Sequence, residues 1–70
     1  MVEIIDRFPC KCGANCKRIL NLKVNALAER IGLEIADTEK GDSMEVVLDA
    51  NSTVKLIKRL KEAYNELLYG

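Results

Sequence analysis

The hydrophobic pattern has the period of a strand near the N-terminus and of a helix near the C-terminus. β-Branched residues recur between Val2 and Phe8, and Pro9 ends this stretch, so we predict a strand there. In the last third, Asn51 or Ser52 caps a predicted helix. Apolar residues line one face of that helix: Leu56, Ile57, Leu60, Ala63, Tyr64, Leu67 and Leu68. Charged residues occupy the other face: Lys55, Lys58, Arg59, Lys61, Glu62 and Glu66.

The middle of the chain predicts a hairpin. Leu33 to Thr38 and Met44 to Leu48 both have strand composition. The four residues 39–42 between them include Gly41 and Asp42, which favour a turn.

The stretch from Cys16 to Ile31 has two interpretations. Apolar residues at spacings of three and four predict a helix capped by Asn15 and ended by Gly32; they are Cys16, Leu20, Val24, Leu27 and Ile31. Alternatively, Leu20, Leu22 and Val24 alternate with polar residues, which predicts a strand and a hairpin with the cysteines at its tip. We favour the helix because its pattern is longer.

These elements give the order β-α-β-β-α. We therefore expect an α+β fold in which two helices cover one face of a three-stranded sheet. The chain shows no linker or repeat, so we expect residues 1–70 to form a single small domain.

Composition places the chain near the lower size limit for a stable fold. Of its 70 residues, 49% are hydrophobic and 31% are charged, and a disulfide, a metal or a partner subunit would strengthen so small a core. Eleven basic and eleven acidic residues cancel, so we do not expect nucleic acid as a partner. Ala26 to Leu33 and Ser52 to Leu60 resemble parts of winged-helix DNA-binding proteins; a nucleic-acid or protein-binding module with structural cysteines is therefore a further alternative.

No apolar run is long enough to span a membrane, and Met1 to Asp6 is too short and too acidic for a signal peptide. We therefore expect a cytoplasmic protein whose thiols stay reduced. The number of cysteines, three, is odd, so they cannot all pair within one chain. The chain has no histidine and none of the usual catalytic constellations, so sequence alone does not establish an enzyme.

The densest chemistry lies at Cys10, Cys12 and Cys16, three thiols within seven residues. In the helical interpretation Cys16 occupies the first turn, where the helix dipole lowers the pKa of a thiol. Lys11, Lys17 and Arg18 would add to this effect. A thiolate is both a nucleophile and a soft metal ligand, so two functions stay open.

The first function is thiol–disulfide exchange, with Cys12 and Cys16 as the catalytic pair, Cys10 as a resolving thiol and another protein as the redox partner. The run from Gly13 to Cys16 and the segment Leu27 to Glu34 resemble small thioredoxin-like redox-disulfide proteins over roughly a third of the chain. The first cysteine of that family's motif falls at Gly13, so the resemblance implies a role for Cys16 alone.

The second function is metal binding by Cys10, Cys12 and Cys16 together, with Lys11, Gly13 and Asn15 as the strap around the ion. Zn²⁺ would need a fourth ligand, which a carboxylate, a water or a thiol from a second chain in a homodimer would supply. Cu(I) accepts three thiolates, and an iron–sulfur cluster could be held with one position open or shared. Partially buried thiols without any chemistry are the simplest alternative.

Overall fold

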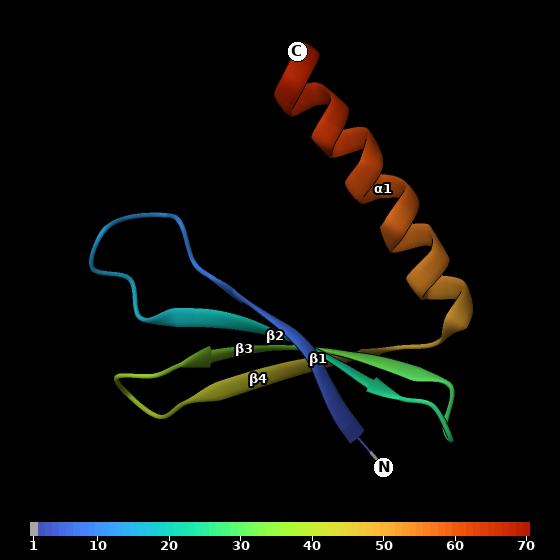
Figure 1. Ribbon diagram of the computed structural model, residues 1–70, viewed down its shortest axis with the longest axis horizontal. Helices are drawn as coiled ribbons and strands as arrows, with labels where there is room; N and C mark the ends of the chain where they lie inside the picture. Colours follow the sequence, from blue (N-terminus) through green and yellow to red (C-terminus); the bar gives the residue numbers. More distant parts are fainter. Residues whose placement is uncertain (1) are drawn as a thin grey trace.

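The computed structural model describes residues 2–70 as one antiparallel sheet followed by one helix. The elements are β1 (Val2–Pro9), β2 (Arg18–Asn25), β3 (Arg30–Asp37), β4 (Ser43–Leu48) and α1 (Ala50–Tyr69). The strands lie in chain order, each antiparallel to the next (Figure 1). The α+β class is therefore correct, but the predicted three-stranded sheet with two helices is wrong.

The predicted helix over residues 16–31 is the source of the error. The structure has strand β2, a turn at Ala26–Glu29 and the start of β3 in its place. β2 pairs along its whole length with β3 and with most of β1, so ladder hydrogen bonds on both sides stabilise it as a strand. Asn15 consequently caps no helix, and Gly32 lies within β3.

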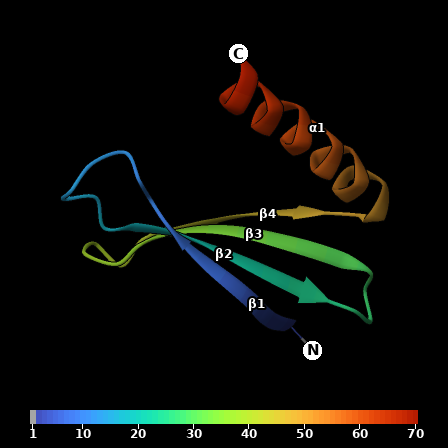
Figure 2. The same cartoon turned by 45° about the horizontal axis from the view of Figure 1, so that its top comes forward.

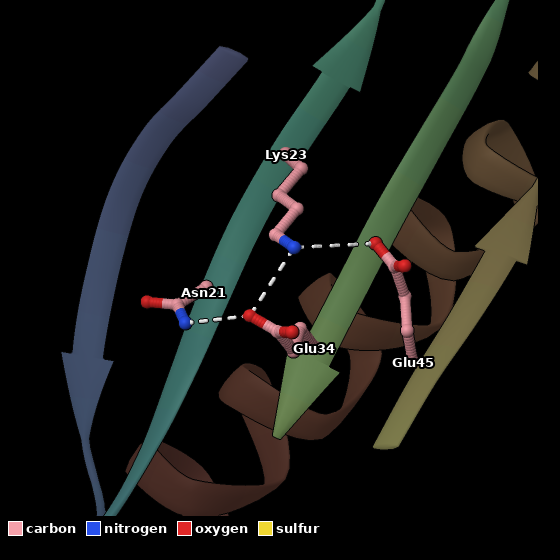
Figure 3. A network of polar contacts seen from close by, with 4 residues as sticks. All are labelled: Asn21, Lys23, Glu34 and Glu45. Carbon is pink, nitrogen blue, oxygen red and sulfur yellow. Dashed lines mark hydrogen bonds and ion pairs between the residues drawn. The ribbon is translucent and has the colours of Figure 1, made fainter. Parts of the chain in front are cut away.

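Polar residues lie on one face of the sheet (Figure 3). The Lys23 ammonium lies 3.2 Å from a Glu34 carboxylate oxygen and 3.7 Å from one of Glu45, so it joins β2, β3 and β4. The Asn21 amide donates to Glu34 at 2.9 Å. Gly32 lies opposite Lys23, and a Cβ there would collide with the Glu45 carboxylate, so these polar side chains need the space that glycine leaves.

Apolar residues form the opposite face of the sheet. Leu20, Leu22 and Val24 alternate with the polar residues of β2, and the register places apolar partners beside them on β3. On β1, Leu20 pairs with Phe8, whereas Leu22 and Val24 pair with Asp6 and Glu3. We call this set the apolar sheet face; it comprises Phe8, Leu20, Leu22, Val24, Ile31, Leu33, Ile35, Met44, Val46 and Leu48.

Helix α1 begins where Asp49 turns the chain out of β4. Asp49 has extended backbone angles, and its carboxylate accepts a hydrogen bond from the Ser52 N–H at 2.8 Å, so Asp49 is the N-cap. The prediction of Asn51 or Ser52 as the cap was therefore wrong by two or three residues. The helix itself, with its amphipathic pattern, is confirmed.

α1 lies on the side of the apolar sheet face but packs on it only at one end. Figure 3 shows the helix behind the polar network, and Figure 2 shows it inclined away from the strands. It contacts only β3 and β4 among the described elements. Thr53 and Leu56, in its first two turns, are half-buried, whereas every residue from Ile57 onward is exposed. No helix within residues 2–70 is both long and apolar enough to traverse a bilayer.

Candidate metal centre

The cysteines lie in and beside the loop that joins β1 to β2, the curved segment on the side away from α1 in Figure 1. Hydrogen bonds fix both ends of this loop. The Cys10 N–H donates to the Arg18 carbonyl at 3.0 Å, which continues the β1–β2 ladder by one residue. At the other end, the Lys17 carbonyl accepts from the Thr38 N–H at 3.0 Å and from the Thr38 hydroxyl at 2.8 Å. The short connection between these ends carries Cys12 and Cys16.

All three thiols point to one place. The sulfur atoms of Cys10, Cys12 and Cys16 lie within 4.8 Å of one another, and none forms a disulfide. A tetrahedral zinc site with Zn–S bonds of about 2.3 Å places its sulfurs about 3.8 Å apart. Small side-chain rotations would close that difference.

The three thiols differ in exposure. Cys12 is exposed, while Cys10 and Cys16 are half-buried. Cys10 also lines an apolar groove with Phe8, Pro9 and Leu20. The cluster therefore has a protein-covered side at Cys10 and a solvent-facing side at Cys12.

Hydrogen bonds within the cluster separate the acidities of two thiols. The Cys12 N–H donates to the Cys10 sulfur, and the Cys12 and Cys16 thiols also donate to it, so the pKa of Cys10 is lowered. The Arg18 guanidinium lowers it further. The same thiol hydrogen bonds, together with repulsion from the neighbouring sulfur charges, raise the pKa of Cys12 to about 11. The pKa of Cys10 is thus lower than that of an ordinary thiol, whereas Cys12 holds its proton at neutral pH.

The charges around the loop suit an anionic cluster. Lys11, Lys17 and Arg18 lie next to the cysteines in the chain, and Asp6 is the nearest acidic residue before them. Three thiolates around a divalent ion leave one net negative charge, which nearby cations offset. Hydrogen bonds from the Lys40 and Glu39 N–H groups lower the pKa of Asp37. Arg18, which lies opposite Asp37 in the β2–β3 ladder, lowers it further.

The structure brings together all three predicted site residues, and the predicted strap of Lys11, Gly13 and Asn15 lies in the same loop. The structure contradicts one argument made for Cys16, however. Cys16 precedes a strand, so no helix dipole acts on its thiol. Sequence reasoning missed Thr38, which anchors the loop from a position 21 residues away from Lys17. No local sequence signal marks a contact of that kind.

Comparisons with known proteins leave this site to be interpreted from its own geometry. No protein-family model, no curated protein and no solved structure matches the chain.

Proposed function

We propose that this chain is a metal-binding domain, and that Cys10, Cys12 and Cys16 hold one soft metal ion as thiolates. The observation that carries the proposal is the convergence of three sulfurs within 4.8 Å on a loop pinned at both ends. In the absence of a metal, three ionised thiols this close would repel one another. Hydrogen bonds to Cys10 and Cys16, and then this repulsion, raise the pKa of Cys12. A bound cation offsets that repulsion because it attracts all three thiolates, so metal binding is the role that suits this cluster best.

The donor set narrows the choice of ion. The chain contains no histidine, and no aspartate or glutamate among residues 2–70 joins the cysteine group. Three thiolates alone satisfy Cu(I), whereas Zn²⁺ would take a water or a donor from another molecule as its fourth ligand. An iron–sulfur cluster on three cysteines would need an outside ligand as well. We therefore assign the site first to Cu(I), which needs no further ligand, and second to Zn²⁺, for which a single water completes the four ligands.

A titration of the reduced protein tests this assignment. The chain is purified without oxygen and titrated separately with Cu(I), with Zn²⁺ and with Co²⁺ as a spectroscopic substitute for zinc. We expect one ion per chain, with an intense sulfur-to-cobalt charge-transfer band. Replacement of any one of Cys10, Cys12 or Cys16 by serine should weaken binding by at least about tenfold, because each loses a thiolate ligand.

The matched control is Ala14→Ser, which introduces the same residue in the same loop, outside the predicted strap, and leaves the three thiols in place. It should bind one ion with the affinity of the parent chain. Equal affinities for the parent and all three cysteine variants would refute the proposed site.

Thiol–disulfide exchange is the second candidate, and the lowered pKa of Cys10 favours it. The roles differ from those expected at first, because Cys10 rather than Cys16 would attack. The Cys10 thiolate would bond to one sulfur of a substrate disulfide and release the other as a thiolate, which takes up a proton. Cys12 would then attack the Cys10 sulfur, and its thiol proton would pass to the second substrate sulfur, which leaves as a thiol. The chain would lose two electrons and the disulfide would gain them.

One purification separates the two candidates. Metal content and intact mass, each with and without reductant, are measured on the same anaerobic sample. A stoichiometric soft metal supports coordination, whereas a metal-free chain two daltons lighter before reduction supports exchange. In both cases the solvent-facing Cys12 would offer a partner protein access to the site, as a metal-exchange or a redox partner. We place the protein in a reducing compartment such as the cytoplasm, which would keep its thiols available.

A further inference from the structure

The chain by itself lacks a hydrophobic core. No hydrophobic side chain among residues 2–70 is buried, and the buried positions are Asn21 and Gly32. A compact monomer of this mass exposes about 4,400 Å². This chain exposes 5993 Å², so roughly 1,600 Å² of surface remains to be covered before it resembles an ordinary folded domain.

The uncovered surface is apolar both on the sheet and on α1. On the apolar sheet face, Ile35, Met44 and Val46 are 54%, 74% and 55% exposed. On α1, which lies over that face, Leu60, Tyr64 and Leu67 are 58%, 60% and 80% exposed. A patch of this kind on a soluble chain marks an interaction surface.

One helix is too narrow to cover this sheet. Four strands at about 4.8 Å spacing form a face roughly 19 Å wide. Packed helices lie 8–10 Å apart, so two helices side by side are needed to cover such a face. α1 contacts only β3 and β4, which leaves β1 and β2 without a covering helix.

The helix also has more apolar surface than its own sheet can use. Its apolar residues extend over about half of the circumference, which is wider than the stripe of a helix that packs on one surface only. Thr53 and Leu56, in the first two turns, approach the sheet. Further along the same face, Leu60, Tyr64 and Leu67 are exposed, because the helix inclines away from the strands (Figure 2).

We propose that a second copy of this chain covers both surfaces, so that the protein folds as an obligate, two-fold symmetric homodimer. The α1 helices lie antiparallel in its centre, and each helix completes the cover of the other chain's sheet. The surplus of about 1,600 Å² per chain falls within the range that obligate dimers bury. A second copy is the occupant because each chain supplies both halves of the contact, a helix stripe and a sheet face.

The charges of α1 specify the antiparallel direction. The half of the helix from Lys55 to Lys61 carries four basic residues and no acidic one, and the next turn carries Glu62 and Glu66. Antiparallel packing centred on Leu60 places Lys58 of each helix level with Glu62 of the other, whereas parallel packing would place every charge beside its like. The net charge of zero adds no repulsion between copies.

Analytical ultracentrifugation of the parent chain, with and without metal, is the first test. We expect a species of twice the 7.8 kDa chain mass, and thermal unfolding whose midpoint rises with protein concentration. A monomer that unfolds cooperatively at a concentration-independent midpoint would overturn the proposal, as would a stable assembly of any other size.

A matched pair of variants tests the surface. Leu60→Gln places an amide in the centre of the contact twice, once per chain, and should weaken the dimer at least tenfold. Asn65→Gln makes the same residue at an exposed, uncharged position of the helix and should leave the dimer within about twofold. Equal dissociation constants for Leu60→Gln and the parent would exclude this face, even if the protein were dimeric.

Disulfide cross-linking tests the direction and does not depend on how well the glutamine variant folds. In a chain with all three cysteines replaced by serine, Leu60→Cys should cross-link two copies on mild oxidation. Val54→Cys should not, because its counterpart in an antiparallel pair lies about 18 Å along the axis. Efficient cross-linking of Val54→Cys, or none at Leu60→Cys, would contradict the antiparallel dimer. The metal titration is a separate measurement, so either proposal can fail without the other.

Discussion

The different pKa values of the Cys10 and Cys12 thiols affect how a metal can bind to the cluster. Cys10 is held toward its thiolate form by the hydrogen bonds it accepts, and Cys12 is held toward its thiol form by the hydrogen bond it donates. An incoming ion must therefore displace the proton of Cys12 at neutral pH. Metal binding and proton release are coupled in this loop.

This coupling predicts that metal affinity rises with pH. Because the pKa of Cys12 is about 11, its thiol is protonated throughout the range from pH 6 to 8, and each proton released on binding should strengthen affinity about tenfold per pH unit. Competition with a chelator of known affinity at three pH values measures the slope. Affinity that does not change with pH, after correction for the chelator, would show that Cys12 is not a ligand.

Backbone strain at one residue gives a prediction about stability. Glu29 ends the β2–β3 turn at a φ of 55°, in the left-handed region that disfavours a side chain. Glu29→Gly should relieve this strain and stabilise the fold by about 0.5–1 kcal/mol, after allowance for the greater freedom of glycine when unfolded. Denaturant unfolding at one fixed protein concentration measures the difference. Ala28→Gly, in the same turn without a positive φ, is the control and should destabilise slightly.

At the scale of elements, one carboxylate determines where the helix begins. Asp49 accepts from the Ser52 N–H, and its carbonyl accepts from the Thr53 N–H at 2.9 Å. Asp49→Ala removes the side-chain cap and should raise the unfolding equilibrium constant roughly fivefold, as is typical for a lost N-cap. Circular dichroism should show fraying at the first turn. Asn51→Ala, at a position next to the cap whose side chain does not bond the Ser52 or Thr53 N–H, should have little effect.

The mistaken helix shows what a single sequence can and cannot specify. Leu20 and Val24 are four residues apart, and this spacing fits one helical turn as well as two alternations of a strand. Pairing with β1 and β3 makes this segment a strand, and the residues of those two strands lie elsewhere in the chain. α1 was predictable because its pattern runs over five turns and no strand can match it.

The site was easier to predict than the fold that carries it. Three thiols within seven residues must lie close together in any compact loop, so the spacing alone indicated the cluster. The lowered pKa of Cys10 depends on the Cys12 N–H and, more weakly, on Arg18, and the fold determines where both groups lie. Because Cys16 does not lie at the start of a helix, the helix-dipole argument for its reactivity does not apply.

For the whole molecule, carboxylates on the sheet and at its ends connect stability to pH. The Asn21 amide, followed by Lys23, lowers the pKa of Glu34, and backbone N–H groups lower the pKa values of Asp37 and Asp49. A lowered pKa in the folded state means that the unfolded chain binds more protons in acid. The contribution of these groups is complete above the unfolded pKa values, near 4, and is lost as pH falls below them.

We therefore expect the denaturant midpoint to be level from pH 7 to about 5 and to decline steadily below that. Glu34→Gln keeps the shape of the side chain but cannot titrate, so its decline should be shallower than that of the parent. Glu39, an exposed turn residue, serves as the control: Glu39→Gln should follow the parent curve. A parent midpoint that rises on acidification would contradict the assigned role of these carboxylates.

The thiol cluster and the apolar surface lie on different parts of the molecule. The β1–β2 loop presents the thiols at one end of the sheet, and α1 with the apolar sheet face lies on one side of it (Figures 1 and 2). Association through that side would stabilise the strands that hold the loop. In the proposed assembly, a second copy would cover that side and leave the thiol loop open.

The central claim is that three sulfurs of this chain bind one ion. X-ray absorption at the edge of the bound metal, on protein loaded with one equivalent of zinc or copper(I), tests that claim most directly. We predict a first shell of three sulfur atoms, at about 2.3 Å for zinc. A first shell of oxygen and nitrogen only would contradict the account.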